Sequence, residues 1–305
     1  MRYVKVILKY FLVLCFMSLV IFALTRSMPL SPVDLLLQQL KLPPTPENKL
    51  LVEMQWGLDK PLYVQYFRWL GAFVRGDWGE SLISKQNIRE EIFRGIPYSV
   101  TLGLGGVLLS ALLGFFGGYL ASLKKGGFFD RLTAFLSLFV QTVPVFILSV
   151  VLIYYIGVKY QLLKVFTGSI FVKMSLGMLM VTLSSVGSIS RVMRKHFLNI
   201  QKQPYIRAEI SRGFLPNKIL LTSGLRPALI GLCSAIVSKF AWVIGGTAVV
   251  EFVFSIPGVS FFLVNSIAQR DYNVIQSYLF FIVIWMMLVH LMFSIIMRLL
   301  GEKVS

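Results

Sequence analysis

YSVTLGLGGVLLSALLGFFGGYLASL, residues 98–123, contains no charged side chain and decides the class of fold. A helix of about 20 mainly apolar residues crosses the hydrocarbon core of a bilayer, and this stretch is long enough to do so. Its apolar residues run without the alternation that marks the strands of a membrane barrel, so we predict an all-α integral membrane protein. Segments of this kind predict six transmembrane helices, near residues 6–26, 98–123, 130–158, 170–191, 227–250 and 274–299.

The composition of the whole chain agrees with a membrane protein. Of its 305 residues, 56% are hydrophobic and only 14% are charged, and the mean hydropathy is +0.77. Too little polar surface remains to cover a soluble globule. A net charge of +17 would suggest nucleic acid as the partner of a soluble protein, but its distribution along the loops indicates orientation in the membrane instead. We expect the lipid bilayer, and no nucleic acid, around this chain.

Basic residues gather in the loops that fall on one side of the predicted spans. They precede the first span, surround the turn near 124–130, and fill or border the loop near 192–226. The positive-inside rule places these loops and both termini in the cytoplasm. The chain then divides into an N-terminal tail with the first helix (1–26), an extracytoplasmic region (27–97) and a transmembrane core (98–305).

The extracytoplasmic region contains PLYVQYFRWLGAFVRGDWG (61–79), in which aromatic and charged residues interleave at helix-like spacing. This pattern predicts short helices at the membrane interface, where Trp and Tyr rings prefer to sit. A folded outer cap without ligand contact is the alternative.

Two of the predicted spans contain residues that shape helix packing. Gly114 and Gly118 in the second span have the small-xxx-small spacing that lets helix backbones approach closely. In the third span, Gln141, Thr142 and Pro144 interrupt the apolar run, and the proline leaves a backbone carbonyl without its usual donor. The sequence therefore predicts tight packing of the second span and a kink in the third, and leaves a binding site at the kink open.

No residue pattern in the chain points to catalysis. There is no Gly-Lys dipeptide and hence no Walker A loop, and His196 and His290 are too far apart in sequence to form a local metal motif. Cys15 and Cys233 lie in apolar spans and form no CxxC pattern. We therefore expect no catalytic residue, no metal site and no cofactor in this chain.

YIRAEISRGFLPNK, residues 205–218, is a hydrophilic segment between two long apolar runs. Pro204 suits the first position of a helix and Gly213 suits its end, with Pro216 shortly beyond. This pattern predicts one short helix from Tyr205 to Arg212.

The predicted helix is amphipathic. With 3.6 residues per turn, its apolar face comprises Ile206, Ile210, Gly213 and Phe214. Arg207 and Ser211 occupy the opposite face, and Glu209 and Arg212 are spaced to form an ion pair. From the residues alone, two interpretations stay open: the helix rests on anionic lipid through its arginines, or it docks on another protein.

The longer stretch PYIRAEISRGFLPNKILLTSGLRPALIG (204–231) resembles the cytoplasmic loop of ABC importer permeases. In that family a short helix, with a glycine at the position of Gly213, inserts into a groove of the ATPase subunit. The family's usual Glu-Ala-Ala aligns with Arg207, Ala208 and Glu209, so the acidic residue is displaced in this chain.

Other stretches narrow the resemblance to the B-type permease of dipeptide, oligopeptide and nickel importers. They follow the family's order: GLDKPLYVQYFRWLGAFVRGDWGESL (57–82), QTVPVF (141–146), GGTAVVEFVFSIPGVS (245–260) and RDYNVIQSY (270–278). Each is weak alone, but their joint order and spacing are specific, and together they span nearly the whole chain.

The resemblance implies a type I ABC importer permease in the bacterial cytoplasmic membrane. Such a subunit pairs with a homologous C-type permease, receives substrate from an extracytoplasmic binding protein and is driven by two cytoplasmic ATPases, which bind ATP and Mg. The residues that it assigns to ATPase coupling are Tyr205, Ile206, Arg207, Glu209, Ile210, Arg212 and Gly213. We assign Gln141, Lys239 and Glu251 to the translocation pathway.

Lys239 is the pathway residue whose depth in the membrane can be estimated from the sequence. It follows Arg226 by 239 − 226 = 13 residues, about 20 Å along a helix, which places it well inside the hydrocarbon. A lysine at that depth costs roughly 2.5–3.5 kcal/mol when it faces lipid, so its side chain should face water or a partner. Attraction of a substrate carboxylate, snorkelling, and an ion pair with the second permease all remain open.

Peptides are the first choice of substrate, and nickel or another metal chelate is the second. The alternative from another class is a secondary transporter driven by an ion gradient. Such a protein usually carries several ionisable residues at membrane depth, whereas here only Lys239 and His290 lie well inside the predicted spans, and no carboxylate does. A purely structural scaffold would not explain the docking loop.

Overall fold

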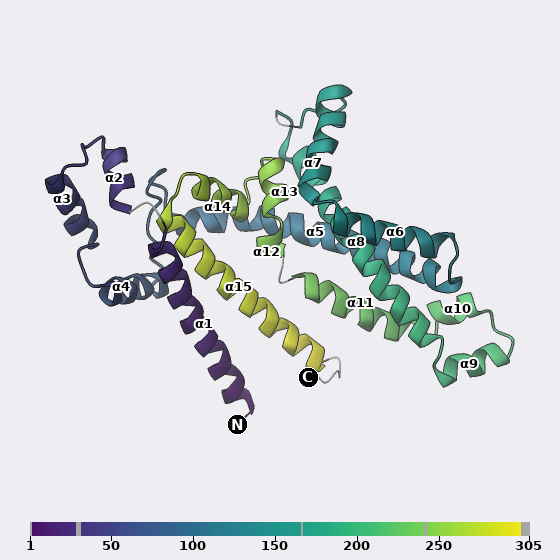
Figure 1. Cartoon of the computed structure of the whole chain (residues 1–305). Helices are drawn as coiled ribbons and strands as arrows, with labels where there is room; N and C mark the ends of the chain where they lie inside the picture. The colour runs from purple at the N-terminus through teal and green to yellow at the C-terminus, as the bar shows by residue number, and fades with distance from the viewer. Residues whose placement is uncertain (1, 29–31, 166, 241–242, 300–305) are drawn as a thin grey trace. The chain divides into compact units, whose positions relative to one another are not determined.

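Helices dominate the computed structural model, which describes residues 2–28, 32–165, 167–240 and 243–299 (Figure 1). Within these ranges no strand is found beyond an isolated bridge between Glu80 and Asn87. The chain forms two compact units, residues 1–96 with 262–305 and residues 97–261. The predicted all-α class is confirmed.

The first unit contains two long helices, α1 (Arg2–Arg26) and α15 (Tyr272–Leu299), which pack side by side in opposite directions (Figure 1). Three short helices follow α1 in sequence: α2 (Pro32–Leu40), α3 (Pro46–Trp56) and α4 (Leu62–Val74). Helix α4 covers most of the stretch 61–79, for which short helices were predicted.

Aromatic rings fill the space between α4 and α15 in the first unit. The rings of Phe73 and Trp78 stack with their centroids 4.7 Å apart, and the centroid of Phe280 lies 4.9 Å from that of Phe73. At the start of α15, Asp271 accepts hydrogen bonds from Ser81 Oγ and from the backbone N–H of Ile83. The stretches 57–82 and 270–278, far apart in sequence, therefore meet in space.

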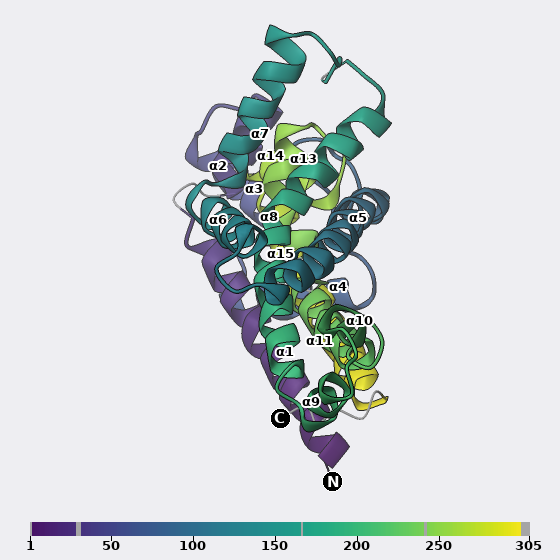
Figure 2. The ribbon, with the colours of Figure 1, turned by 90° about the vertical axis from the view of Figure 1, so that its right-hand side faces the viewer.

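The second unit begins within α5 (Ile88–Leu123) and ends within α14 (Val259–Ala268). Its other helices are α6 (Phe128–Thr142), α7 (Val145–Ile153), the π-helix η1 (Tyr154–Lys159), α8 (Ile170–Ile200), α9 (Pro204–Ser211), α10 (Pro216–Leu221), α11 (Leu225–Phe240), α12 (Val243–Gly246) and α13 (Ala248–Val253). Helix α8 is the centre of this unit, because it packs against α6 and α11 and lies between α5 and α6 in Figure 2.

Glycines bring the backbones of α5 and α8 together. A Cβ atom on Gly114 would fall 2.6 Å from Ile189, and one on Gly118 would fall 2.5 Å from Met193. The same Gly118 position lies 2.7 Å from the carbonyl oxygen of Ser190, so the α8 backbone itself is in the way of a side chain. The predicted tight packing of the second span is confirmed at both glycines.

The third predicted span is sharply bent. Helix α6 ends at Thr142, and the helix that begins at Val145 turns away by 94°. Pro144 lies in the break, where it has no N–H to continue the hydrogen-bond ladder of α6. The predicted interruption is confirmed, and the change of direction is larger than a simple kink.

Four helices in the described ranges are long and apolar enough to cross a membrane: Leu8–Arg26, Ile88–Leu123, Ile170–Ile200 and Tyr272–Phe293. The bent pair 128–142 and 145–159 makes a fifth if it is counted as one span. The predicted span 227–250 is not found as one helix, since α11 ends at Phe240, residues 241–242 lie outside the described ranges, and α12 and α13 are short. Gly245 and Gly246 lower helix propensity there. The predicted count of six is thus not confirmed.

Gly118→Ala is expected to lower the melting temperature of the purified protein in detergent, because the added methyl group meets Met193 and the α8 backbone. Overpacking of this kind costs about 1–3 kcal/mol. Gly245→Ala is the matched control, since no atom of the described residues lies within 4 Å of a Cβ at that helical position. Equal melting temperatures for the two variants would contradict the close contact between α5 and α8.

Candidate functional site

Helix α9 forms where the sequence places its start and stop signals. Pro204 occupies the first turn, and Gly213, just beyond the C-terminal cap at Arg212, adopts a φ of +90° that is open to glycine at little cost. The N–H of Phe214 then donates to the carbonyl of Glu209, which closes the helix end. The prediction of one short helix from Tyr205 to Arg212 is confirmed to within a residue at each end.

Ile206 fixes α9 to the rest of the second unit. Its side chain is only 1% exposed and belongs to an apolar cluster with Phe115 and Tyr119 of α5, Phe197 of α8 and Leu220 of α10. A side chain buried in this way is not available to a separate protein. Ile206 is therefore an anchor of α9 in this chain, and the apolar face predicted for the helix is divided between the core and the surface.

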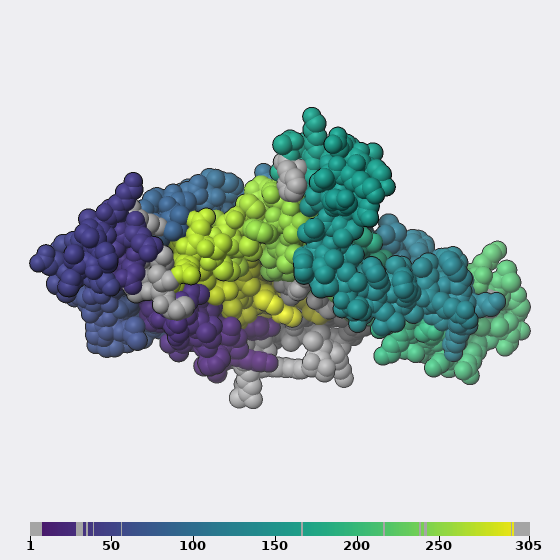
Figure 3. All heavy atoms as spheres, turned by 45° about the horizontal axis from the view of Figure 1, so that its top comes forward, coloured from purple at the N-terminus to yellow at the C-terminus, as the bar shows by residue number. Residues whose placement is uncertain are grey.

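The outer side of the hydrophilic segment presents apolar and basic residues together. Ile210, Phe214 and Leu215 are 39%, 60% and 63% exposed. Arg207 and Arg212 are exposed on the same short segment. Figure 3 shows this part of the chain (green) at the surface of the second unit. Such a surface suits contact with a partner that offers both apolar and acidic groups.

Glu209 is engaged within the chain. Ser223 Oγ, in the loop that joins α10 to α11, donates a hydrogen bond of 2.7 Å to its carboxylate. The predicted ion pair of Glu209 with Arg212 is wrong, because no such pair occurs among the described side chains and the carboxylate faces Ser223 instead. The hydrogen bond closes the segment 209–223 into a compact loop.

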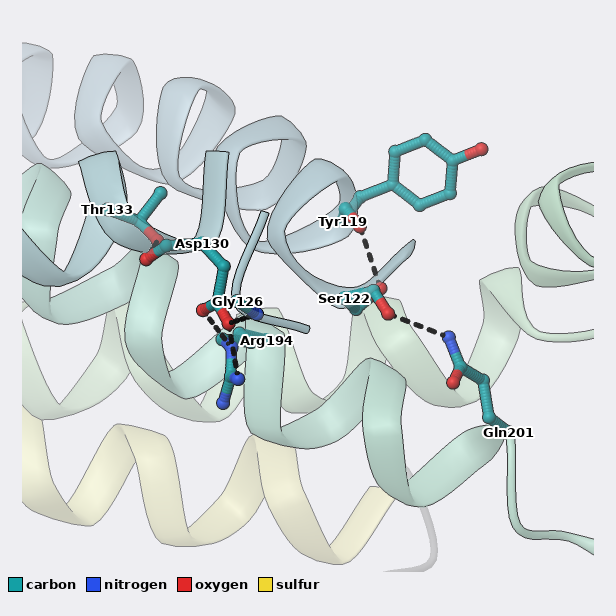
Figure 4. A network of polar contacts seen from close by, with 7 residues as sticks. All are labelled: Tyr119, Ser122, Gly126, Asp130, Thr133, Arg194 and Gln201. Carbon is teal, nitrogen blue, oxygen red and sulfur yellow. Dashed lines mark hydrogen bonds and ion pairs between the residues drawn. The ribbon is translucent and has the colours of Figure 1, made fainter. Parts of the chain in front are cut away.

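Polar contacts tie the neighbouring helix ends to one another (Figure 4). Asp130 at the start of α6 forms an ion pair with Arg194 of α8, with Nη2 2.8 Å from the carboxylate, and accepts from the N–H of Gly126. Gln201 Nε2 donates to the carbonyl of Ser122 at the end of α5. These bonds hold α5, α6 and α8 together beside α9.

Sequence reasoning missed this network. Arg194 was one of several basic residues read only as an orientation signal, and nothing in the sequence sets it apart from Arg191 and Lys195. Tyr119 was also missed, although its hydroxyl donates a 3.0 Å hydrogen bond to the carbonyl of Asn217 and so joins α5 to α10. In both contacts the two residues are far apart in sequence, and rules based on short residue spacing predict contacts only between near neighbours.

The three residues predicted for the pathway occupy separate environments. Gln141 is exposed near the end of α6 and donates to Ser137 Oγ, and Lys239 is half-buried near the end of α11. Glu251 of α13 is completely buried. No hydrogen bond or ion pair between described atoms joins any two of them. Their part in a pathway stays a prediction.

The family described as "binding-protein-dependent transport system inner membrane component" matches residues 91–305. A probable peptide ABC transporter permease protein of Sinorhizobium fredii is 26% identical over 302 residues, which cover 96% of this chain and 95% of the relative.

Two further relatives have narrower names. A dipeptide transport system permease protein of Bacillus subtilis is 29% identical over 250 residues, covering 80% of this chain and 81% of the relative. A glutathione transport system permease protein of Escherichia coli is 29% identical over 227 residues, covering 74% of each chain.

The ion pair between Asp130 and Arg194 is expected to contribute about 0.5–1 kcal/mol to stability, since it is bidentate but partly open to solvent. A double-mutant cycle with Asp130→Ala and Arg194→Ala, read by thermal unfolding in detergent, measures the coupling. Arg191→Ala, at an exposed position on the same helix, is the control and should show no coupling to Asp130→Ala. Additive effects of the first pair would contradict the contact.

Proposed function

The chain belongs to the family of binding-protein-dependent transport system inner membrane components, and from this membership we propose that it is the permease subunit of an ATP-driven importer of peptides. Relatives that align with three quarters or more of the chain are named for peptides, dipeptides and oligopeptides. These names favour peptides over the nickel chelates that the resemblance also allowed. ATP hydrolysis takes place in partner subunits, and this chain supplies transport and coupling.

We infer a complex of this chain with a homologous C-type permease, two cytoplasmic ATPases that bind ATP and Mg, and an extracytoplasmic binding protein. The observation that carries the inference is that α9 is anchored in the chain and still presents a surface. Ile206 is buried in the core, whereas Ile210, one turn further along, and two arginines are exposed. A subunit that takes up movement from another protein needs both features.

Movement of α9 would pass to the membrane helices through packed contacts. Ile206 lies among side chains of α5, α8 and α10, so α9 cannot shift without displacing them. The hydrogen bonds Tyr119–Asn217 and Gln201–Ser122 restrain the same helix ends. We propose that an ATPase bound at α9 moves α5 and α8 as one body.

The proposed orientation places the loops near 124–130 and 192–226 in the cytoplasm and residues 27–97 outside. It is supported by the basic residues in those loops and by the opposite directions of α1 and α15, which bring their outer ends to the same side of the first unit. Peptides would then enter from the side of α2, α3 and α4.

Single-cysteine labelling tests this orientation. In a background in which Cys15 and Cys233 are replaced by serine, Glu47→Cys in α3 is expected to react with a membrane-impermeant maleimide on intact spheroplasts. Lys125→Cys should react only after the membrane is opened; both positions are exposed. Labelling of position 125 alone in intact spheroplasts would reverse the proposed topology.

Ile210→Asp is expected to reduce copurification of the ATPase subunits by roughly tenfold or more, because it places a carboxylate at an apolar contact. The control is Leu51→Asp in α3, which makes the same kind of change at an exposed residue of the other unit and should leave the ATPases bound. Normal ATPase association and uptake by the Ile210→Asp variant would favour a lipid-surface role for α9.

The substrate is tested with the assembled wild-type complex in proteoliposomes. Peptides presented with the binding protein should stimulate ATP hydrolysis and accumulate inside, and the ligand eluted from the copurified binding protein should be a peptide by mass spectrometry. Elution of a nickel chelate would overturn the peptide assignment, and uptake driven by an ion gradient without ATP would overturn the importer class.

A further inference from the structure

Glu251 lies at the centre of a buried polar cluster in an otherwise apolar part of the second unit. The residue is 0% exposed, and its two carboxylate oxygens have different partners. Oε1 accepts a 2.6 Å hydrogen bond from Thr247 Oγ1, one turn earlier. Oε2 accepts from the backbone N–H groups of Ser260 and Phe261, at 2.9 and 3.0 Å. We call this set, with Ser99, the Glu251 cluster.

The backbone groups held by the Glu251 cluster are those that begin α14. Val259, Ser260 and Phe261 are its first residues, and N–H groups in the first turn of a helix have no acceptor within the helix. Ser99 Oγ accepts from the N–H of Val259 at 2.9 Å, and Glu251 accepts from the other two. Side chains from α5 and α13 therefore cap a third helix.

The turn between α13 and α14 is built around this carboxylate. A Cβ atom on Gly258 would lie 2.4 Å from Glu251 Oε2 and 2.6 Å from Ser99 Oγ, so only glycine leaves room for both acceptors. Phe254 and Ile256, on the same turn, are completely buried. Ser260 Oγ also donates to the carbonyl of Ile244 in α12. The turn is thus fixed from several sides.

Helix α5 connects the Glu251 cluster to the coupling site at α9. Ser99 and Tyr119 belong to the same continuous helix and are 119 − 99 = 20 residues apart, or about 30 Å along its axis. Tyr119 packs in the cluster that holds Ile206 and donates to Asn217. Figure 1 shows α9 and α13 near opposite ends of the second unit, with α5 running between them.

We propose that Glu251 is a positioning residue of transport, which ties the α13–α14 turn to α5 so that movement of α9 reaches this turn. The proposal rests on the permease function proposed above. Glu251 then acts as a hydrogen-bond acceptor inside the protein. It does not line the translocation pathway, to which it was assigned from the sequence. Neither α13 nor α14 is long enough to cross a bilayer, so their junction depends on internal hydrogen bonds.

Two substitutions of similar size separate an acceptor from a charge. In Glu251→Gln the amide oxygen can still accept from Ser260 and Phe261. The NH₂ group can donate to Thr247 Oγ1, whose own proton then goes to the carbonyl of Val243. In Glu251→Met the N–H groups of Ser260 and Phe261 lose their acceptor. The charge is removed in both variants, and the hydrogen bonds are lost only in the second.

The measurement is peptide uptake per ATP hydrolysed in proteoliposomes, with ATPase copurification measured in parallel. Glu251→Gln should stay within about twofold of wild type. Glu251→Met should lose roughly tenfold in uptake per ATP, the effect of leaving buried donors unpaired, while ATPase association at α9 is kept. Equal losses of uptake per ATP in the two variants would overturn the proposal. If those losses also depended on the charge of the peptide, Glu251 would instead act as a charged residue of the pathway.

Milder variants keep the proposal testable should Glu251→Met fail to assemble. Ser99→Ala removes the acceptor of the Val259 N–H and the hydrogen bond between the Ser99 hydroxyl and Glu251, and it should lower uptake per ATP by a few fold with ATPase association unchanged. Ser110→Ala, at another completely buried serine of α5, is the control, because among the described residues that hydroxyl bonds only to the carbonyl of Val107 in its own helix. Wild-type coupling in Ser99→Ala would overturn the link through α5. Absence of peptide uptake by the wild-type complex would instead count against the proposed function.

Discussion

Close backbone contact between α5 and α8 sets the geometry of the second unit, because both the proposed coupling site at α9 and the Glu251 cluster depend on where α5 lies. The contact exists only where glycines remove side chains from α5, at Gly114 and Gly118 among others. Between apolar helices in lipid there is little hydrophobic drive for association, so van der Waals contact over a closely fitted surface must supply it. The apolar cluster around Ile206 is built on the same two helices, which makes the position of α9 a consequence of this packing.

Features set by local chemistry could be predicted from the sequence. Pro204 and Gly213 bound α9, Pro144 breaks the third span, and the Gly114–Gly118 spacing marks a tight helix contact, because each acts through its own backbone or immediate neighbours. The span 227–250 could not be resolved in the same way. Its composition is apolar throughout, but hydropathy does not report that the helix is interrupted between Phe240 and Val243.

Contacts between distant segments escaped prediction for a different reason. Spacing rules paired Glu209 with Arg212, three residues away, whereas the folded chain offers Ser223 at 2.7 Å. The same limit applies to Glu251, which was assigned to the translocation pathway from the sequence. Its partners include the N–H groups of Ser260 and Phe261, which need acceptors outside their own helix because the helix begins there. Pro257 and Gly258 are the residues in the sequence that could have indicated a helix start just after them.

The hydrogen bond that Glu209 accepts from Ser223 affects the charge of the α9 surface. In the resembling family an acidic residue stands at the position of Arg207, and here the remaining acidic residue of the helix is turned toward Ser223. The exposed side therefore combines Arg207 and Arg212 with apolar side chains and carries positive charge. A partner that binds this surface must supply acidic groups or backbone carbonyls next to the two arginines. Like-charge juxtaposition costs several kcal/mol at an interface, so a partner with basic groups at the same place would bind this surface less well.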